Sequence, residues 1–291
     1  MSRPYQITVR ILPILSLLAL PVCSWSAMSS KAEALYQVTD YQASLQILSV
    51  DTAPDAATFA LMGKNHFMLG DYRRATEFFE KALALNPRSS EYELWLGRAY
   101  GKRAETGTWM LAPSNASKAR QHFEKAAVLD AHNAEALNDL FDYYLNAPGF
   151  LGGGLDKAEA VAQQIAASRP AEYHFELAQI AEHRKQYAEA EDHLRRAMAL
   201  APGQVGRVLD LARYLARRGR ISESDAVFAQ AAQLSPNDPR VAFARAKTYI
   251  DQRRNIEQAQ KLLHQYLESR LTPDDPPKSA AEKLLHQAAG G

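Results

Sequence analysis

The strongest constraint on this chain is an internal repeat of 34 residues. Residues 59–87 align with residues 208–236, and residues 174–202 fit between them, with small residues, large apolar residues and prolines in corresponding places. Pro202 and Pro236, which end successive copies, are 34 residues apart. Each copy holds two stretches with apolar residues at helical spacing, which predicts a pair of helices with one buried face each. A single pair cannot bury that face alone, so neighbouring copies have to stack into a solenoid.

The repeat resembles the tetratricopeptide repeat, a helix–turn–helix unit with this period. The resemblance is carried best by residues 56–89, with the turn Gly70-Asp71-Tyr72 and the ending ALALNP, and it extends from about residue 30 to residue 272. It implies an all-α fold, a right-handed α–α superhelix of antiparallel helix pairs with a C-terminal capping helix. The predicted organisation is a degenerate N-terminal helix pair at 30–54, six repeats at 56–89, 90–133, 134–170, 171–204, 205–238 and 239–272, and a capping helix at 277–289.

Two repeats carry extra residues at the turn between their helices, about ten in 90–133 and about five in 134–170. The second insertion contains GFLGGG, residues 149–154. A glycine-rich loop before a helix can bind phosphate, but dinucleotide and P-loop sites follow a strand, and no Gly-Lys-Ser/Thr is present here. We therefore expect an elongated turn, with Asp156 and Glu159 as a capping box for the next helix. An anion site at that helix N-terminus is the alternative.

The two insertions also bring apolar residues to one edge of the solenoid, because adjacent repeats stack in register. We expect these residues to pack on each other and on the helices beneath. The alternative is an exposed contact patch for a partner, and the exposure of Trp109 distinguishes the two. The residues of this loop patch are Trp109, Met110, Leu111, Phe150 and Leu151.

In the family that the repeat resembles, the first helix of each unit lines a concave surface on which protein or peptide partners dock. Transferred to this chain, that surface is basic in the first repeats, acidic in the middle and basic at the end, which favours an extended or helical peptide of complementary charge. The alternative is that these are ordinary solvated charges. The resemblance implies as partner-binding residues Lys64, Phe67, Leu94, Arg98, Lys102, Glu135, Asp139, Asp142, Phe175, Glu182, Arg213, Arg217, Phe243 and Lys247, with Glu172, Leu209 and Arg240 on the same helix faces.

Composition and motifs argue against catalysis, metals and nucleic acid. Lysine and arginine number 34 against 33 acidic residues, so bulk charge favours no nucleic-acid partner. The eight histidines are scattered without an HExxH motif, no Gly-x-Ser-x-Gly is present, and the single cysteine lies at Cys23 in the N-terminal segment. The repeats also leave little sequence for an enzyme domain. We predict no catalytic residues, no bound metal and no cofactor.

The N-terminal segment has the order of a secretory signal peptide, predicted at residues 1–27. Arg3 and Arg10 precede the apolar run Ile11–Cys23, and the small-residue stretch Ser24-Trp25-Ser26-Ala27 follows. The run has about 13 residues, fewer than the roughly 20 of a membrane-spanning helix. We expect cleavage after Ser26 or Ala27; an uncleaved membrane anchor and lipidation at Cys23 are the alternatives, although Leu20-Pro21-Val22 departs from the small residues that precede a lipidated cysteine.

These observations predict an exported protein, most simply a periplasmic one in a bacterium. Its function would be to act as a non-enzymatic scaffold or adaptor of the cell envelope, binding a protein or peptide through the concave face. The alternative is an accessory module that captures substrate for an envelope enzyme of a cell-wall or polysaccharide pathway. Contact with a membrane is expected only through the N-terminal segment, if it is uncleaved or lipidated.

Overall fold

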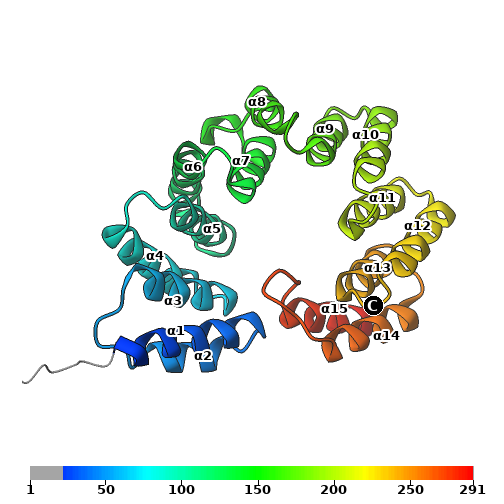
Figure 1. Ribbon diagram of the computed structural model, residues 1–291. Coiled ribbons are helices and arrows are strands. Elements are labelled where there is room, and N and C mark those ends of the chain that lie inside the picture. Colours follow the sequence, from blue (N-terminus) through cyan, green and yellow to red (C-terminus); the bar gives the residue numbers. More distant parts are fainter. Residues whose placement is uncertain (1–21, 291) are drawn as a thin grey trace, which may run out of the picture.

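The computed structural model describes residues 22–290, and this part of the chain is helical throughout, without a β-strand (Figure 1). Residues 1–21, which hold most of the predicted signal peptide, lie outside the described range. No helix within that range is both long and apolar enough to cross a membrane. The helices are α1 Val22–Gln37, α2 Tyr41–Leu48, α3 Ala56–Met68, α4 Tyr72–Leu85, α5 Ser90–Thr106, α6 Ala112–Leu129, α7 Ala134–Asn146, the 3₁₀-helix η1 Gly149–Leu151, α8 Leu155–Ile165, α9 Pro170–His183, α10 Tyr187–Leu200, α11 Val205–Arg217, α12 Ile221–Leu234, α13 Pro239–Asp251, α14 Ile256–Glu268 and α15 Lys278–Gly290.

Successive helices pack as antiparallel pairs, and the pairs follow one another around an open ring (Figure 1). The first helix of each pair faces the inside of the ring, and the second helix covers the outside. The prediction of an all-α superhelix of helix pairs is confirmed. At the end of the chain, α15 packs against α13 and α14 and buries Ala281 and Leu284.

Within a pair, a small residue of the first helix receives a large side chain of the second. A Cβ atom added to Gly63 would lie 2.8 Å from the ring of Phe79, and one added to Gly97 would lie 2.7 Å from the ring of Phe123. In the pair α7–α8 the sizes are exchanged. Phe141 occupies the first-helix position and Ala162 the second, and both are buried in the same core cluster. The pairs thus keep their combined volume while the residue types change places, which preserves dense packing.

The short turns within the pairs share one backbone form. The second residue after the first helix has a positive φ angle: 63° at Thr39, 79° at Gly70, 62° at Lys185, 74° at Gly219 and 51° at Arg253. In each case its N–H and the next N–H donate back to carbonyls of the last helical turn, as at a helix C-terminus of the Schellman type. Glycine takes this conformation without strain, and a lysine or arginine does not.

The glycine-rich insertion is a closed turn between α7 and α8. The Gly153 and Gly154 amides donate to the Pro148 and Tyr144 carbonyls, so these amides are not available to an anion. The expected capping box is wrong, because Gly154 is the N-cap of α8 and no side chain caps that helix. The longer turn places Asp156 inside the first helical turn, and Glu159 pairs instead with Arg184 at the end of α9.

Candidate functional site

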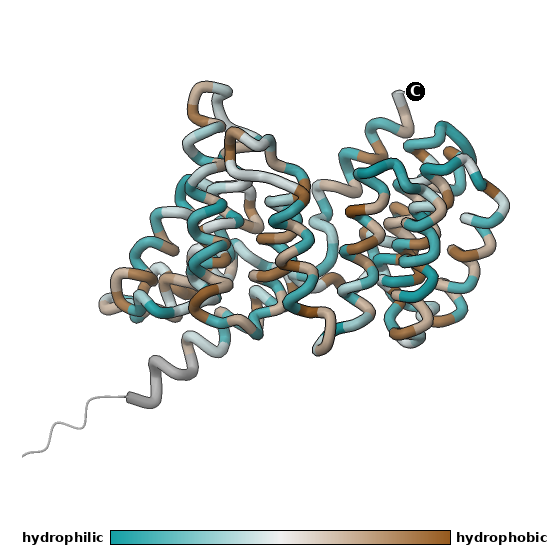
Figure 2. Tube along the Cα trace, turned by 90° about the horizontal axis from the view of Figure 1, so that it is seen from above, coloured by the Kyte–Doolittle hydropathy of each residue, from teal (hydrophilic) through white to brown (hydrophobic). Residues whose placement is uncertain are grey.

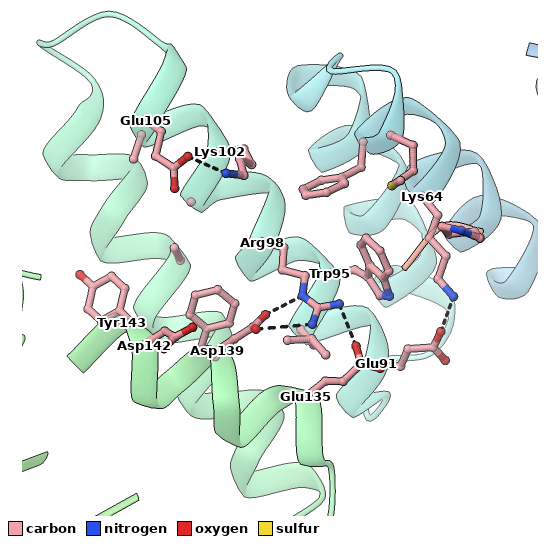
Figure 3. Close-up of a pocket in the computed structure, with 18 of the residues that line it drawn as sticks. Lys64, Glu91, Trp95, Arg98, Lys102, Glu105, Glu135, Asp139, Asp142 and Tyr143 are labelled. Atoms are coloured by element: carbon pink, nitrogen blue, oxygen red, sulfur yellow. Dashed lines mark hydrogen bonds and ion pairs between the residues drawn. The ribbon is translucent and has the colours of Figure 1, made fainter. Parts of the chain in front are cut away.

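The inner surface of the first repeats forms a groove with a volume of about 1160 Å³. Side chains of α1, α3, α5, α6 and α7 line it, and the loop 273–277 ahead of α15 contributes Pro273, Asp274, Asp275 and Pro277 from the other end of the chain. The N-terminal and C-terminal parts of the ring therefore meet at this groove. Figure 3 shows its wall over α3, α5 and α7. We call it the inner groove.

Trp95 of α5 is the centre of the aromatic wall. Its ring makes an edge contact with Phe67 at 5.3 Å between centroids and stacks near Phe79 at 6.0 Å. Lys64 and Arg98 each place a cation over the same ring, at 5.5 Å and 4.9 Å from its centroid. Tryptophan is one of the residue types that contribute most of the binding energy at protein interfaces. Its ring also attracts cations, as Lys64 and Arg98 show here. Sequence reasoning missed Trp95, although it directly follows the predicted Leu94.

The basic residues of the groove are already neutralised by carboxylates of the chain (Figure 3). The Arg98 guanidinium lies 2.5 Å from an Asp139 oxygen and 2.9 Å from a Glu135 oxygen. Two further ion pairs of 2.6 Å join Lys64 Nζ to Glu91 and Lys102 Nζ to Glu105. The predicted basic character of the first repeats is therefore wrong, because each cation pairs with a carboxylate of its own helix, as Lys102 does, or of the next first helix, as Lys64 and Arg98 do.

The same correction applies to the last repeats. Each predicted cation there has a carboxylate of the chain beside it, so this surface offers paired charges to a partner and not a basic stretch. The pairs are Arg213 with Asp210 at 2.5 Å, Arg217 with Glu182 at 2.8 Å, Arg240 with Asp238 at 2.6 Å and Lys247 with Asp251 at 2.6 Å.

What remains unpaired in the inner groove is acidic. Within the described residues, no cation lies at ion-pair distance from Asp142 of α7 or from Asp274 of the C-terminal loop, and both line the groove. The Asp142 side chain is exposed to the groove, but the protein that surrounds it removes part of its water, and together with the nearby Asp139 and Glu172 carboxylates this raises its pKa to about 6. Near pH 7 the groove therefore has an excess of negative charge.

The fourteen predicted partner-binding residues do not all line the inner groove. Eight line the inner groove: Lys64, Phe67, Leu94, Arg98, Lys102, Glu135, Asp139 and Asp142. The other six lie elsewhere: Phe175, Glu182, Arg213, Arg217, Phe243 and Lys247. Phe175 packs under the Arg207 guanidinium, 4.0 Å from its ring centroid, and Phe243 packs on Tyr266 at 5.0 Å. The first contact joins two repeats and the second joins the two helices of one repeat, so both rings take part in packing within the chain.

Glu176 of α9 is a buried carboxylate that sequence reasoning missed. Only 1% of its surface is exposed, and neither carboxylate oxygen accepts a hydrogen bond from the described residues. Burial, reinforced by the Glu172 and Asp142 carboxylates and opposed by the Arg169 and Arg207 guanidinium groups, raises its pKa to about 8. No pattern in the sequence sets this glutamate apart from its exposed neighbours.

The loop patch is exposed, so the expectation that its residues pack on the helices is wrong for four of them. The exposed fractions are 83% for Trp109, 72% for Met110, 55% for Leu111 and 83% for Phe150. Leu151 alone is half-buried, at the rim of the inner groove. The insertions extend beyond the helices that they connect, and this leaves their tips without neighbours.

The histidines form one close pair, His174 with His193, with 3.0 Å between their Nδ1 atoms. Among residues 22–290, no group of three or more His, Cys, Asp or Glu side chains has the arrangement of a metal site.

Comparisons with known proteins agree with this architecture. The family model of the tetratricopeptide repeat matches residues 56–89 and 171–204. The chain contains tetratricopeptide repeats. Over 101 residues, 34% of this chain, it is 36% identical to superkiller complex protein 3 of Mus musculus, and the matched region spans 6% of that relative's length.

Two solved structures of tetratricopeptide repeat proteins share the fold. One, from Parabacteroides merdae, has a TM-score of 0.60 and 14% identity, covering 91% of this chain and 99% of its own. The other, a thermophilic protein from Thermus thermophilus, has a TM-score of 0.53 and 20% identity, covering 65% of this chain and 98% of its own. Proteins built from these repeats mediate protein–protein interactions through their extended surfaces.

Proposed function

We propose that the chain is a non-enzymatic scaffold or adaptor of the bacterial cell envelope that holds a segment of a partner protein in the inner groove. The observation that carries this proposal is the groove itself. Its volume of about 1160 Å³ exceeds the roughly 300–1,000 Å³ of small-molecule sites. It joins an aromatic wall around Trp95 to polar groups from several helices, the composition of a protein-binding surface.

The charges of the groove favour a partner segment that carries lysine or arginine. A cation entering the groove meets Asp142 and Asp274, whereas Lys64 and Arg98 are occupied by their own carboxylates. An apolar side chain beside that cation would pack on Trp95 and gain from burial of both surfaces.

The test of the groove is a comparison of two cross-linking positions in living cells. A photo-reactive amino acid at Asn146 faces the groove, and one at Lys261 lies exposed on the outer helix α14. We expect Asn146 alone to capture a protein. Equal capture at both positions, or none at Asn146, refutes the groove proposal.

Charge reversal then tests the chemistry of the captured segment. Asp142→Lys should weaken binding by at least tenfold, because it removes the unpaired carboxylate without breaking an internal ion pair. Glu189→Lys on the outer helix α10 is the matched control and should leave affinity within twofold. Glu135 and Asp139 are unsuitable for reversal, since both hold Arg98. Unchanged affinity of the Asp142 variant contradicts a cationic partner.

The envelope location is proposed from the charged, apolar and small-residue order of residues 1–27. Every side chain that the structure describes as buried lies at Ala32 or later, so cleavage after Ser26 or Ala27 removes none of these side chains. Mass spectrometry of the protein from a periplasmic fraction should give Ala27 or Met28 as the first residue. A lipid-modified Cys23 or an intact N-terminus would establish one of the alternatives.

A further inference from the structure

The turns that join the two helices of each repeat lie along one edge of the ring, because the helices of a pair are antiparallel and the pairs stack in register. We call this the turn edge. Both insertions are on it, as are the turns around Lys185, Arg218 and Arg253. Helix α15 also ends at this edge, and in Figure 2 loops with hydrophobic tips project from the same upper edge as the C-terminus.

Three consecutive turns of this edge carry a free cation. Lys185, Arg218 and Arg253 are exposed, and no carboxylate of the described residues lies at ion-pair distance from them. The exposed carboxylates Glu189 and Glu257 lie in the first turn of the helices that follow, and within the described residues neither pairs with one of these three cations.

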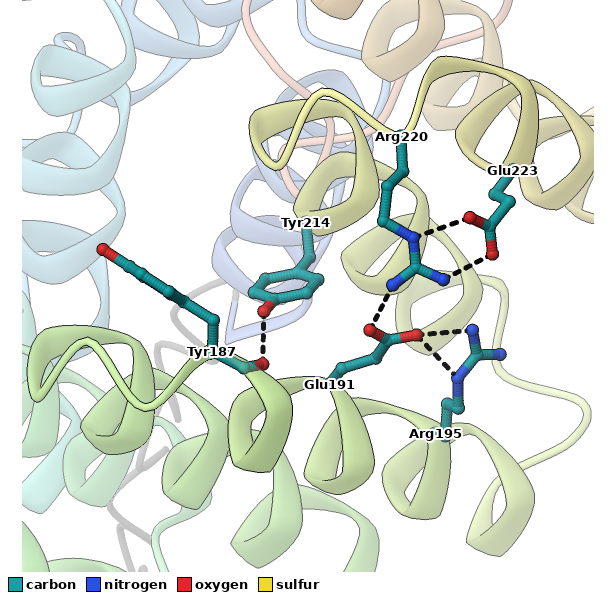
Figure 4. Close-up of polar contacts among 6 residues, drawn as sticks. All are labelled: Tyr187, Glu191, Arg195, Tyr214, Arg220 and Glu223. Atoms are coloured by element: carbon teal, nitrogen blue, oxygen red, sulfur yellow. Dashed lines mark hydrogen bonds and ion pairs between the residues drawn. The ribbon is translucent and has the colours of Figure 1, made fainter.

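The neighbouring arginines of the same turns are occupied. Arg220 is held by Glu191 and Glu223, and Glu191 also binds Arg195 of α10 (Figure 4). Arg254 pairs with Asp225 at 2.9 Å. These ion pairs connect the turns to neighbouring helices. The Arg218 guanidinium carbon lies 3.5 Å from the centroid of the Tyr187 ring, and no carboxylate of the described residues pairs with this arginine.

Two of the free cations stand where stability favours glycine. Lys185 and Arg253 occupy the positive-φ turn position that Gly70 and Gly219 fill in other repeats. A side chain with a Cβ atom is strained in this conformation and glycine is not. Thr39 takes the same conformation in the first hairpin, with a φ of 63°, so the strain by itself assigns no role; what Lys185 and Arg253 add is an exposed positive charge at this edge.

The same edge presents apolar tips in the two preceding repeats. Trp109, Met110 and Phe150 are each at least 72% exposed, on loops that project past the helices. Tryptophan prefers the interface between water and lipid, and cations beside it are attracted to anionic headgroups. Single-stranded nucleic acid binds aromatic residues within a basic groove, whereas these tips stand on a projecting edge.

We propose that the turn edge docks on the surface of an anionic lipid bilayer. Trp109, Met110 and Phe150 enter the headgroup region, and Lys185, Arg218 and Arg253 lie against the lipid phosphates. This surface is separate from the inner groove, so the chain would hold a partner protein at a membrane without inserting a helix.

The test is co-sedimentation of residues 28–291, the part that contains every described buried side chain, with vesicles of phosphatidylglycerol and phosphatidylcholine or of phosphatidylcholine alone. We expect binding only to the anionic vesicles, weaker at high salt, with a blue shift of the tryptophan emission that Trp109→Ser abolishes. Lys185→Gly combined with Arg253→Gly should lower the partition coefficient roughly thirtyfold, the factor for two cations at an anionic surface, without loss of thermal stability.

Matched controls lie at the opposite edge. Arg88→Gln removes an exposed cation, and Val128→Ser removes a side chain that is 83% exposed, like Trp109. Both should leave vesicle binding within twofold. The proposal is overturned by equal binding to neutral and anionic vesicles, by unchanged binding of the Lys185/Arg253 variant, or by an equal loss in the controls. Binding of single-stranded DNA in place of vesicles would also overturn it and assign the edge to nucleic acid.

Discussion

Replacing Glu176 with glutamine is expected to stabilise this protein at neutral pH. The carboxyl group is buried on α9, and no described side chain or amide donates a hydrogen bond to it. Burial is the main reason that its pKa rises from 4.5 to about 8, with the Glu172 carboxylate adding to the shift. The folded protein therefore holds this proton more tightly than the unfolded chain does.

The size of the effect follows from these two pKa values. Between pH 4.5 and about pH 8 the folded state binds more protons, so the free energy of unfolding falls as the pH rises through this window. One pKa unit corresponds to about 1.4 kcal/mol, so by pH 7 the loss relative to pH 4.5 is about 3 kcal/mol. Glutamine has nearly the same shape and no charge. Glu176→Gln should therefore be about 3 kcal/mol more stable than the wild type at pH 7 and equal to it at pH 4.5.

The assay is urea unfolding followed by circular dichroism at several pH values from 4.5 to 8.5. The unfolding midpoint of the wild type should fall across this range, and that of Glu176→Gln should fall less. Glu189→Gln, at an exposed site on α10, is the control and should change stability by less than about 0.5 kcal/mol. A stability difference between Glu176→Gln and wild type that is the same at pH 5 and pH 8 would refute the assignment of a neutral buried carboxyl.

Three further substitutions test the packing and pairing described above. Glu93→Gln should destabilise the protein by about 2 kcal/mol at pH 7 in urea unfolding. The Glu93 carboxylate lies 2.6 Å from His122 Nδ1 and 2.5 Å from Lys125 Nζ, and these contacts outweigh burial and hold the Glu93 pKa below its usual value. An unchanged unfolding midpoint contradicts this. Gly97→Ala should lower the thermal midpoint by several degrees, since its Cβ would lie 2.7 Å from a buried ring. Gly101→Ala, on the same helix with a nearest neighbour at 4.0 Å, should raise the midpoint, and equal effects of the two alanines would count against close helix approach.

The architecture of the chain was predictable from the sequence because it is a local property repeated many times. Each hairpin is set by apolar spacing over about 30 residues, by the small residue opposite a large one, and by the breakers at its ends. Gly63 and Gly97 show this directly, since their places in the repeat alone predict close contact with the second helix. In the pair α7–α8, however, the large residue Phe141 is on the first helix and the small residue Ala162 on the second. This arrangement keeps the combined volume but not the residue types, so the residue pattern of the repeat did not predict it.

The binding surfaces were less predictable, because their properties arise between repeats. Residues on the first helices were identified as a face, but Arg98 and Asp139 are 41 positions apart and neutralise each other across two helices. Asp274 reaches the same groove only because the ring brings the end of the chain back to its beginning. The sequence identified the residues of the loop patch, but it did not predict that most of them are exposed.

The sequence by itself determined that this chain would be a solenoid of helix pairs, since a 34-residue period of amphipathic helices has no other way to bury its apolar faces. The tertiary structure decided which charges remain free, where the groove lies and which aromatic side chains face water. Burial, and ion pairs such as that of Arg98 with Asp139, depend on distances in space between residues of different repeats, and the spacing along the chain does not contain those distances.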